Sequence, residues 1–356
     1  MIIYTRSPYF ITVDEASQVG SKIELRIWNG TGSAPTGATY ILSKSIASTT
    51  QRKNSYNISP YIREYIENVA PIYTADKTDS INMWANVEVK RYKETSIGVY
   101  SLLNTTTYLG VYGYTLYTQG YNFTNASNDF IPLTNVEKDI RYNRDSLYPY
   151  INVLINPSTE LNIIATYKDL SGGNIANVNY TSTKGMLKVP VTLANSNYDN
   201  GNTLTIKYTL SAVDYTFIYR IIPVCEPKYT PVICSFINRY GGWEFLTFFK
   251  TRKDDINVKG SNYNLLSDTL DYNYQRGQSK SFNLNGKQTV KLNTGFVPEN
   301  YSSSIQDLLL SETVLLDGKP VEVKTQSANL KTSLNDKNIN YELDFEYSYN
   351  LINNVI

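Results

Sequence analysis

The chain has 356 residues, of which 41% are hydrophobic and 18% charged, as in a folded protein with two or three apolar cores. Its formal net charge of +1 argues against a broad basic surface that grips nucleic acid. It contains no histidine, which removes the commonest general base and metal ligand. With only Cys225 and Cys234, nine residues apart, zinc sites of the Cys₄ and Cys₂His₂ types are excluded. We expect two buried, reduced thiols, with a disulfide as the alternative.

The start of the chain, MIIYTRSPYF, lacks the basic region and apolar core of a secretory signal. No stretch approaches the ~18 consecutive apolar residues of a membrane helix. We therefore expect a protein that is made and kept in a cytoplasm unless an assembly carries it out, and we expect no membrane contact.

Alternation of apolar and polar residues predicts short β-strands along most of the chain. Residues 22–28, KIELRIW, alternate as a strand with one wet face should. Further strands are predicted at 38–44, 81–92, 106–119, 150–155, 161–167, 186–193, 203–210 and 214–224. Turn clusters rich in Asn, Gly, Ser and Asp separate them. The expected fold is mainly β, with two or three tandem antiparallel β-sandwich domains of the fibronectin or immunoglobulin type.

Two short helices interrupt this pattern. The first is predicted at 59–69, with Ser59 as N-cap and Pro60 at the first helical position. The second is predicted at 298–311, beginning near Pro298. Each has an apolar face, so each is expected to pack across an open end of a sandwich. The residues of these faces are Ile58, Ile62, Tyr65, Ile66 and Val69 in the first, and Tyr301, Ile305, Leu308 and Leu309 in the second.

Composition places two boundaries. The charged, irregular residues 135–149 separate a first β unit from a second. Residues 222–232 contain three prolines, which predict a stiff, extended crossing outside the sheets. The expected domains are 1–134 with the helix 59–69, 148–224, and 231–356 with the helix 298–311.

Residues 235–250, SFINRYGGWEFLTFFK, contain paired glycines between two apolar stretches. A phosphate-binding glycine loop needs a characteristic spacing between a strand and a helix, and that spacing is absent. We therefore predict a hairpin in which Gly241 and Gly242 supply positive φ, with Val232, Cys234 and Phe236 on one strand face.

Two further hairpins are predicted in the last unit. The dipeptides Asn285-Gly286 and Asp317-Gly318 favour two-residue turns whose twist matches the flanking strands. They predict a compact antiparallel sandwich over 231–356.

Acidic pairs were considered as catalytic groups. Glu64 and Glu67 fall on the polar side of the first helix, and Asp254 and Asp255 fall in a mixed-charge loop. In the C-terminal run, Glu342, Asp344 and Glu346 alternate with Tyr341, Leu343 and Phe345, as on the wet face of a strand. The sequence therefore indicates no catalytic, cofactor-binding or metal-binding residues, no cofactor and no enzymatic activity.

Basic and aromatic residues occur together at 90–93, 141–144 and 248–253. Each cluster is short and is followed by acidic or polar residues, so solvated surface is the expectation. The alternative is a passive lining for DNA, to which Arg141 or Arg144 would contribute.

Residues 223–250, PVCEPKYTPVICSFINRYGGWEFLTFFK, resemble a segment of virion proteins from tailed phages of Bacteroidetes, including the crAss-like phages. The stretches YNISPYIREYIE and LLLSETVLLDGKPVEVKT resemble the same group. None of these stretches is a catalytic signature, and no site residue is carried over. The resemblance implies a repeating structural subunit of the neck or tail, such as a ring below the portal.

The functional hypothesis is a structural virion protein forming a homo-oligomeric ring, six- or twelve-fold, in the neck or tail through which the genome passes. Its partners would be its own copies, adjacent ring or portal proteins and, passively, phage DNA. It would reside in the virion, and in the host cytoplasm during assembly. Its 32 tyrosines suit half-buried sheets and interfaces. The alternative is a tail-fibre or capsid-surface protein that binds a receptor or carbohydrate. A bacterial surface protein and an enzyme are weaker hypotheses.

Overall fold

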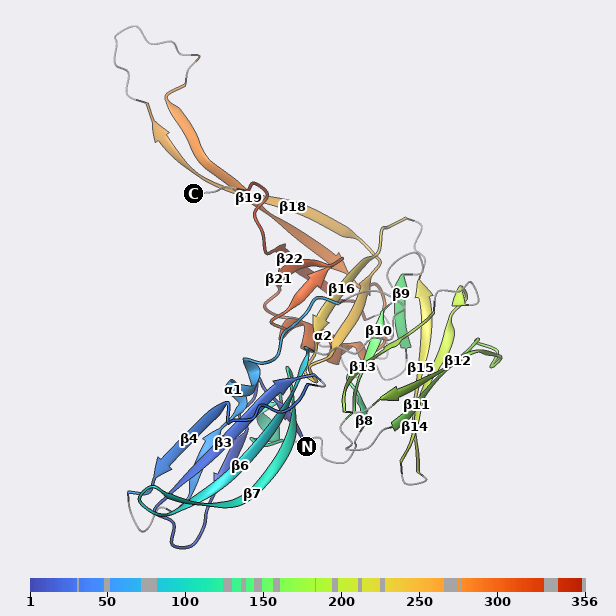
Figure 1. The fold of residues 1–356 in the computed structure, drawn as a ribbon. Helices are drawn as coiled ribbons and strands as arrows, with labels where there is room; N and C mark the ends of the chain where they lie inside the picture. Colours follow the sequence, from blue (N-terminus) through green and yellow to red (C-terminus); the bar gives the residue numbers. More distant parts are fainter. Residues whose placement is uncertain are drawn as a thin grey trace.

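The described part of the chain is mainly β, with 57% strand, 7% helix and two α-helices, as predicted (Figure 1). Three β units follow one another along the chain, and a long two-stranded arm extends from the third. The computed structural model describes residues 1–30, 32–47, 52–71, 82–123, 130–135, 139–143, 149–155, 161–182, 184–193, 198–210, 213–224, 228–265, 275, 277–329 and 339–353.

The first unit is a five-stranded sheet with a two-stranded sheet and a helix packed on one face. The strands of the larger sheet are, in spatial order, β1 (Ile2–Tyr4), β7 (Val99–Val111), β6 (Trp84–Ser96), β3 (Gly20–Asn29) and β4 (Tyr40–Ser45). The smaller sheet pairs β2 (Phe10–Val13) with β5 (Asn54–Asn57). The predicted alternation holds in β3, where Ile23, Leu25 and Ile27 are buried and the residues between them are half-buried.

The middle unit is a sandwich of two sheets around one core. The larger sheet has the order β12 (Asn174–Ser182), β11 (Leu161–Lys168), β14 (Asn202–Leu210), β15 (Val213–Val224) and β9 (Asp139–Asn143). The smaller has the order β13 (Gly185–Pro190), β10 (Tyr150–Ile155) and β8 (Phe130–Pro132). Buried residues of both sheets, such as Ala165, Ile206, Val153 and Val189, form one cluster.

Both predicted connections contribute to this sandwich. Strand β9 lies within 135–149 and pairs in parallel with β15, so this segment is partly a sheet strand. Strand β15 continues to Val224, with Pro223 opposite Tyr142, so the proline-rich crossing begins later than predicted. Proline is tolerated there because Pro223 lies beyond the residues of β15 that pair with β14.

The third unit is a curled seven-stranded sheet around helix α2 (Tyr301–Leu309). The sheet order is β17 (Trp243–Phe248), β16 (Val232–Ile237), β20 (Val314–Leu316), β21 (Lys319–Val323), β22 (Glu342–Tyr347), β19 (Ser279–Asn293) and β18 (Arg252–Asn264). The curl brings the rings of Phe248 and Phe345 within 5.8 Å although their strands are not neighbours. In β22 the predicted alternation is confirmed, with Leu343, Phe345 and Tyr347 buried.

The two helices are shorter than predicted. Helix α1 spans only Ser59–Arg63, and its N-cap is Ile58 without a side-chain cap. The Ser59 hydroxyl instead donates to the carbonyl of Ser7, a tertiary contact that outcompetes local capping. The predicted apolar faces are partly confirmed: Ile58, Ile62 and Ile66 are buried in the first unit, and Tyr301, Ile305 and Leu308 in the third. Tyr65 and Leu309 are only partly buried, and Val69, beyond the end of α1, is 46% exposed.

The predicted turns divide into one that is confirmed, one that is partly right and one that is wrong. Asp317 and Gly318 have φ of 46° and 77° between β20 and β21, as a two-residue hairpin requires. Gly241 has φ of 84°, but Gly242 is not in the positive-φ region. Asn285 and Gly286 form no turn, because they lie inside β19 opposite Lys259 and Val258.

Other predictions need smaller corrections. The strand predicted at 106–119 ends at Val111, and a short 3₁₀ helix, η1, follows at Tyr117–Gln119. Asp254 and Asp255 lie in β18 and not in a loop, with ion-pair partners Arg252 and Lys253. Cys234 is a buried free thiol, whereas Cys225 and Arg144 lie outside the described residues.

Within the described ranges no helix is long and apolar enough to span a membrane.

The contrast between the two dipeptides is testable by alanine substitution. Gly318→Ala places a side chain at positive φ and should cost about 1 kcal/mol in the free energy of unfolding. Gly286→Ala should cost less, because its backbone is not left-handed and its nearest neighbour is the side chain of Leu351, at 3.3 Å. Urea unfolding checks both, with Gly37→Ala, which meets nothing within 4 Å, as the control. A larger loss for Gly286→Ala than for Gly318→Ala would contradict the strand assignment.

Candidate functional site at the junction of the three units

The hairpin β16–β17 is buried on both faces, because each face belongs to a different core. Every residue of both strands is buried. One face points into the core of the third unit and the other into that of the first unit. The hairpin residues in the third core are Val232, Cys234, Phe236, Leu246 and Phe248, and those in the first core are Ile233, Ile237, Trp243 and Phe245. The predicted strand face of Val232, Cys234 and Phe236 is confirmed.

The small sheet of the middle unit has the same property. Strands β10 and β13 are buried throughout. Val153 and Leu187 point into the middle core, whereas Leu154 and Met186 belong to the core of the first unit. The core of the first unit is therefore continuous with residues of the other two units, and the three units meet around the hairpin. We call this region the junction.

Asn238 organises the loop that joins the two hairpin strands. Its side-chain oxygen accepts hydrogen bonds from the backbone N–H of Tyr240 (3.0 Å) and Gly242 (3.2 Å). Its amide nitrogen donates to the carbonyl of Leu133 (3.1 Å) and to Glu244 (2.8 Å). These bonds occupy the side-chain amide of Asn238 inside the protein, so the backbone N–H groups of Tyr240 and Gly242 are not available to a ligand.

The paired glycines allow close packing between units. A Cβ at Gly242 would lie 2.7 Å from the Cβ of Leu133, which precludes any side chain there. A Cβ at Gly241 would lie 3.0 Å from the backbone nitrogen of Tyr112, in addition to its positive φ. The glycine pair therefore serves the contact with the first and middle units, in agreement with the structural interpretation of this loop.

Two buried carboxylates, Glu244 and Asp307, lie in one hydrogen-bond network behind the loop. Each side chain belongs to a residue only 3% exposed. Asn135 joins them, since its amide nitrogen donates to both. Glu244 also accepts from Ser304 and Asn238. Asp307 also accepts from the Tyr114 hydroxyl (2.8 Å) and from the backbone N–H of Arg239 (3.0 Å).

This network draws on all three units, with Tyr114 after the last strand of the first, Asn135 after β8 of the middle and Asp307 in α2 of the third. Burial raises the pKa of Glu244, and the charge of Asp307 raises it further despite the hydrogen bonds from Ser304 and Asn238. Protonated Glu244 can donate to the Ser304 hydroxyl, which rotates to accept. In that protonated form the network needs no charge on Glu244.

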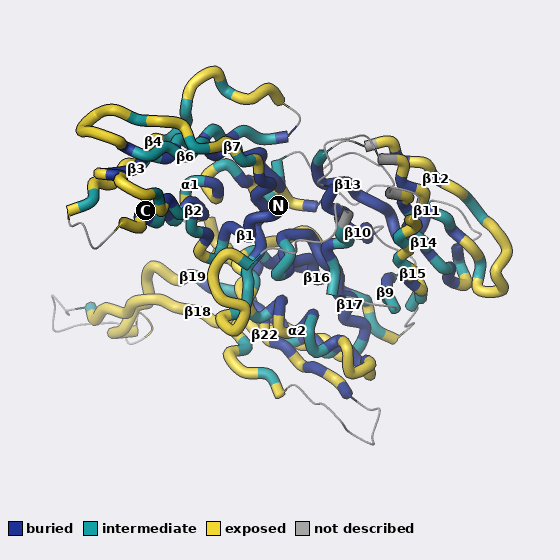
Figure 2. The backbone as a smooth tube through the Cα atoms, turned by 90° about the horizontal axis from the view of Figure 1, so that it is seen from below, coloured by how far each residue is buried: buried dark blue, intermediate teal, exposed yellow. Residues whose placement is uncertain are grey.

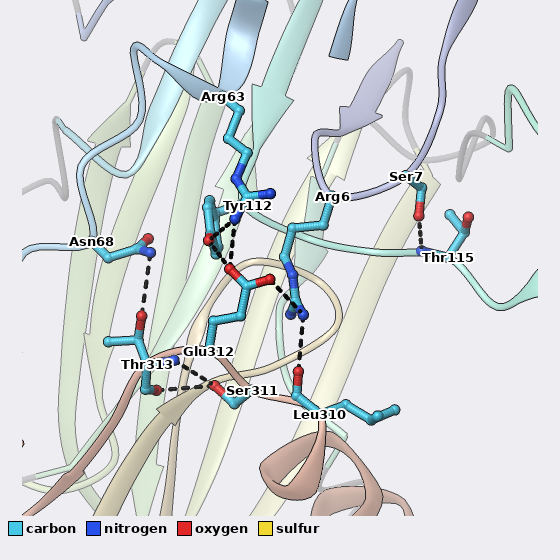
Figure 3. A network of polar contacts seen from close by, with 10 residues as sticks. All are labelled: Arg6, Ser7, Arg63, Asn68, Tyr112, Thr115, Leu310, Ser311, Glu312 and Thr313. Carbon is cyan, nitrogen blue, oxygen red and sulfur yellow. Dashed lines mark hydrogen bonds and ion pairs between the residues drawn. The ribbon is translucent and has the colours of Figure 1, made fainter. Parts of the chain in front are cut away.

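A second network joins the first unit to the end of α2 (Figure 3). Glu312 pairs with Arg6 at 3.2 Å and with Arg63 at 2.6 Å, and it accepts from the Tyr112 hydroxyl. Arg6 also donates to the carbonyl of Leu310 at 3.0 Å. Burial acts to raise the pKa of Glu312, but the Tyr112 hydroxyl and the two guanidinium groups lower it on balance. Because Glu312 is partly exposed, each ion pair adds only about 0–1 kcal/mol to the stability of the fold. This network therefore contributes more to the orientation of α2 relative to the first unit than to stability.

The predicted surface groups do not join the junction as a catalytic set. Glu64 lies at the end of α1 and accepts from Tyr40, and Asp254 and Asp255 lie on the arm. Arg141 donates to the carbonyl of Phe296 and lies 5.9 Å from the ring of Phe249, so it links β9 to the third unit. Within the described residues no three acidic, cysteine or histidine side chains gather as metal ligands.

Sequence analysis did not single out Glu244 or Asp307. A signal exists for Glu244, because it is the one charged residue within the apolar run WEFLTFF. A lone acid in a strand that lacks alternation indicates a fully buried strand with a buried polar partner. Asp307 carries no comparable signal, since an acid one position from Leu308 on a short helix is ordinarily solvated.

We predict that Glu244→Gln makes the protein more stable at neutral and alkaline pH. The pKa of Glu244 is raised above its usual 4.5, so its stabilising contribution is complete below that pH and declines as pH rises through the folded-state value. Glutamine resembles the protonated form, so the stability gain of the variant over the wild type should grow from pH 4.5 to pH 8. A gain of ~1 kcal/mol in the free energy of unfolding would raise the melting temperature by about 2–4 °C. Scanning calorimetry at several pH values checks this. A pH-independent difference would contradict it.

Asn238→Ala should destabilise the folded protein by about 3 kcal/mol. The substitution leaves the Leu133 carbonyl, Glu244 and two backbone N–H groups short of a partner, at ~1–3 kcal/mol for each group that water cannot reach. Urea unfolding measures the loss. Asn179→Ala, at an exposed position of β12, is the matched control and should change stability by less than about 0.5 kcal/mol. Equal effects of the two substitutions would contradict the proposed role of Asn238.

The sequence matches no protein-family model and shows no significant similarity to a curated protein. The geometry of the junction centres on residues 223–250. That segment includes the whole β16–β17 hairpin, from Val232 to Phe248.

Proposed function

We propose that the protein is a structural subunit of a tailed-phage particle, in which copies form a closed ring in the neck or tail. The observation that carries this proposal is the junction, in which three β units share their cores through β16–β17 and β10–β13. A subunit of a closed ring must hold its two contact surfaces at a constant angle, because a small angular error is repeated at every contact. Shared cores supply this stiffness, which a flexible linker would not.

The segment that resembles phage virion proteins, residues 223–250, is the segment that forms the junction. A protein with a similar segment would keep the same angle between its β units even if its exposed surfaces had a different sequence. This agreement between resemblance and geometry supports a structural role. In this proposal the ring contacts adjacent ring or portal proteins, resides in the virion, and allows the genome to pass through its channel.

The mass of the purified full chain tests the proposal. We expect closed oligomers of six or twelve copies by light scattering, with rings of matching symmetry in negative-stain images. A stable trimer without rings would instead favour a fibre or receptor-binding protein. If the chain stays monomeric alone, the decisive measurement is its copy number in the purified particle. A count that is not a multiple of six would contradict the ring.

A further inference from the structure

The arm formed by β18 and β19 extends beyond the core that stabilises the rest of the third unit (Figures 1 and 2). All 13 residues of β18 are exposed, and β19 changes from exposed to buried along its length. At ~3.3 Å per residue the arm is roughly 40 Å long. A two-stranded ribbon is only marginally stable in water by itself, so an additional strand would stabilise it.

The outer edge of β18 is unpaired in the part of the chain that the structure describes. Strand β18 is the last strand of the seven-stranded sheet, and no strand of the described ranges pairs with its outer edge. The extra residue of the arm's bulge lies in β19, since Lys259 is opposite Asn285 while Ser261 is opposite Phe282. The alternation of β18 is therefore uninterrupted.

The direction of the free backbone groups follows from one hydrogen bond beyond the strand. Leu265 donates its N–H to the carbonyl of Gln278 at 2.7 Å, so odd-numbered residues point their backbone groups at β19. Even-numbered residues from Asp254 to Asn262 then direct their N–H and C=O groups outward. This edge can accept a further antiparallel strand.

The side chains of β18 differ on its two faces. Ile256 and Val258, 62% and 64% exposed, lie on one face. The opposite face carries Asp255, Asn257 and Lys259. These five consecutive residues are arranged symmetrically about Asn257, with an apolar residue on each side of it and then one acid and one base.

We propose that β18 pairs antiparallel with β18 of a second copy, about a two-fold axis at Asn257. In this register Ile256 lies opposite Val258 of the second copy, and the two such pairs form an apolar cluster on one face. On the other face Asp255 lies opposite Lys259 of the second copy, also twice. Directly opposed apolar and opposite-charge pairs are those that stabilise antiparallel sheets.

Neighbouring registers are less favourable. An axis at Ile256 would oppose Lys253 to Lys259, and an axis at Asp255 would oppose that carboxylate to its own copy. An axis at Val258 would leave the charges unmatched. Lysine on an edge strand ordinarily discourages pairing, but in the proposed register each Lys259 meets a carboxylate. Charge therefore selects the axis at Asn257.

This contact is separate from the ring and would form equally between two otherwise monomeric chains. Because it is two-fold, in a ring it would join two rings face to face. One pair of strands buries an area near or below the ~1,200 Å² of the smallest stable interfaces, so the pair should dissociate on dilution. The test therefore uses a concentration series.

Sedimentation of the full chain with exchanged charges tests the register. Asp255→Lys or Lys259→Glu alone should weaken the pairing at least 10-fold, because each opposes like charges, and the double variant Asp255→Lys/Lys259→Glu should restore it. Circular dichroism of each variant should match the wild type, since both residues are exposed. A wild type without concentration-dependent association, or a double variant as weak as the singles, would overturn the proposal.

Disulfide trapping gives a second, independent readout. Opposed residues that are not hydrogen-bonded across a pair have Cα atoms ~4.5 Å apart, within the ~4.4–6.8 Å range of disulfides. In a Cys225→Ser background, Asn257→Cys should form a cross-linked dimer under mild oxidation. Ser261→Cys, four residues along the same face, would lie opposite Lys253 and should not. Equal cross-linking of the two variants, or none of Asn257→Cys, would overturn the assigned axis.

Discussion

The constraint on which the rest of the structure depends is that β16 and β17 have no solvent face. Ile233 and Trp243 belong to the core of the first unit, and Phe236 and Leu246 to that of the third. Removal of either neighbouring unit would expose one apolar face of the hairpin to water, which costs ~25 cal/mol of free energy per Å² of apolar surface. The units therefore hold one another in place through a shared hairpin, which is why the proline-rich segment before it need not be stiff to fix their arrangement.

The same constraint explains the polar chemistry at the junction. At the end of this hairpin Asn238, Gly241 and Gly242 are buried, so their backbone groups need partners inside the protein. Asn238 is such a partner for Tyr240 and Gly242, and Glu244 accepts from Asn238 in turn. Burying a charged carboxylate costs free energy. Glu244 and Asp307 share the donor Asn135, so both buried carboxylates lie where all three units meet. Loss of one donor would therefore weaken contacts between several units.

The arm shows the opposite situation within the same sheet. Val290 and Leu292 of β19 are buried in the third core, whereas Phe282 and Leu284 of the same strand are about half exposed. The same strand is therefore buried at one end and exposed at the other. The molecule therefore combines a densely packed centre with an extended, exposed pair of strands.

Local pattern in the sequence by itself determined the features that depend on neighbouring residues. Alternation placed Leu343 and Phe345 on the buried face of β22, and Asp317-Gly318 formed its turn because the backbone preference of these residues acts over two positions. Only the tertiary structure decided that Asn285-Gly286 stays in a strand, that Ser59 bonds to Ser7, and that Glu244 and Asp307 meet. Periodicity indicates that one face is buried. It cannot indicate that both faces of the hairpin are covered, because the covering residues are distant in the sequence and are brought there by the packing of the units. Asn238 and Leu133, for example, are hydrogen-bonded although they lie more than 100 residues apart.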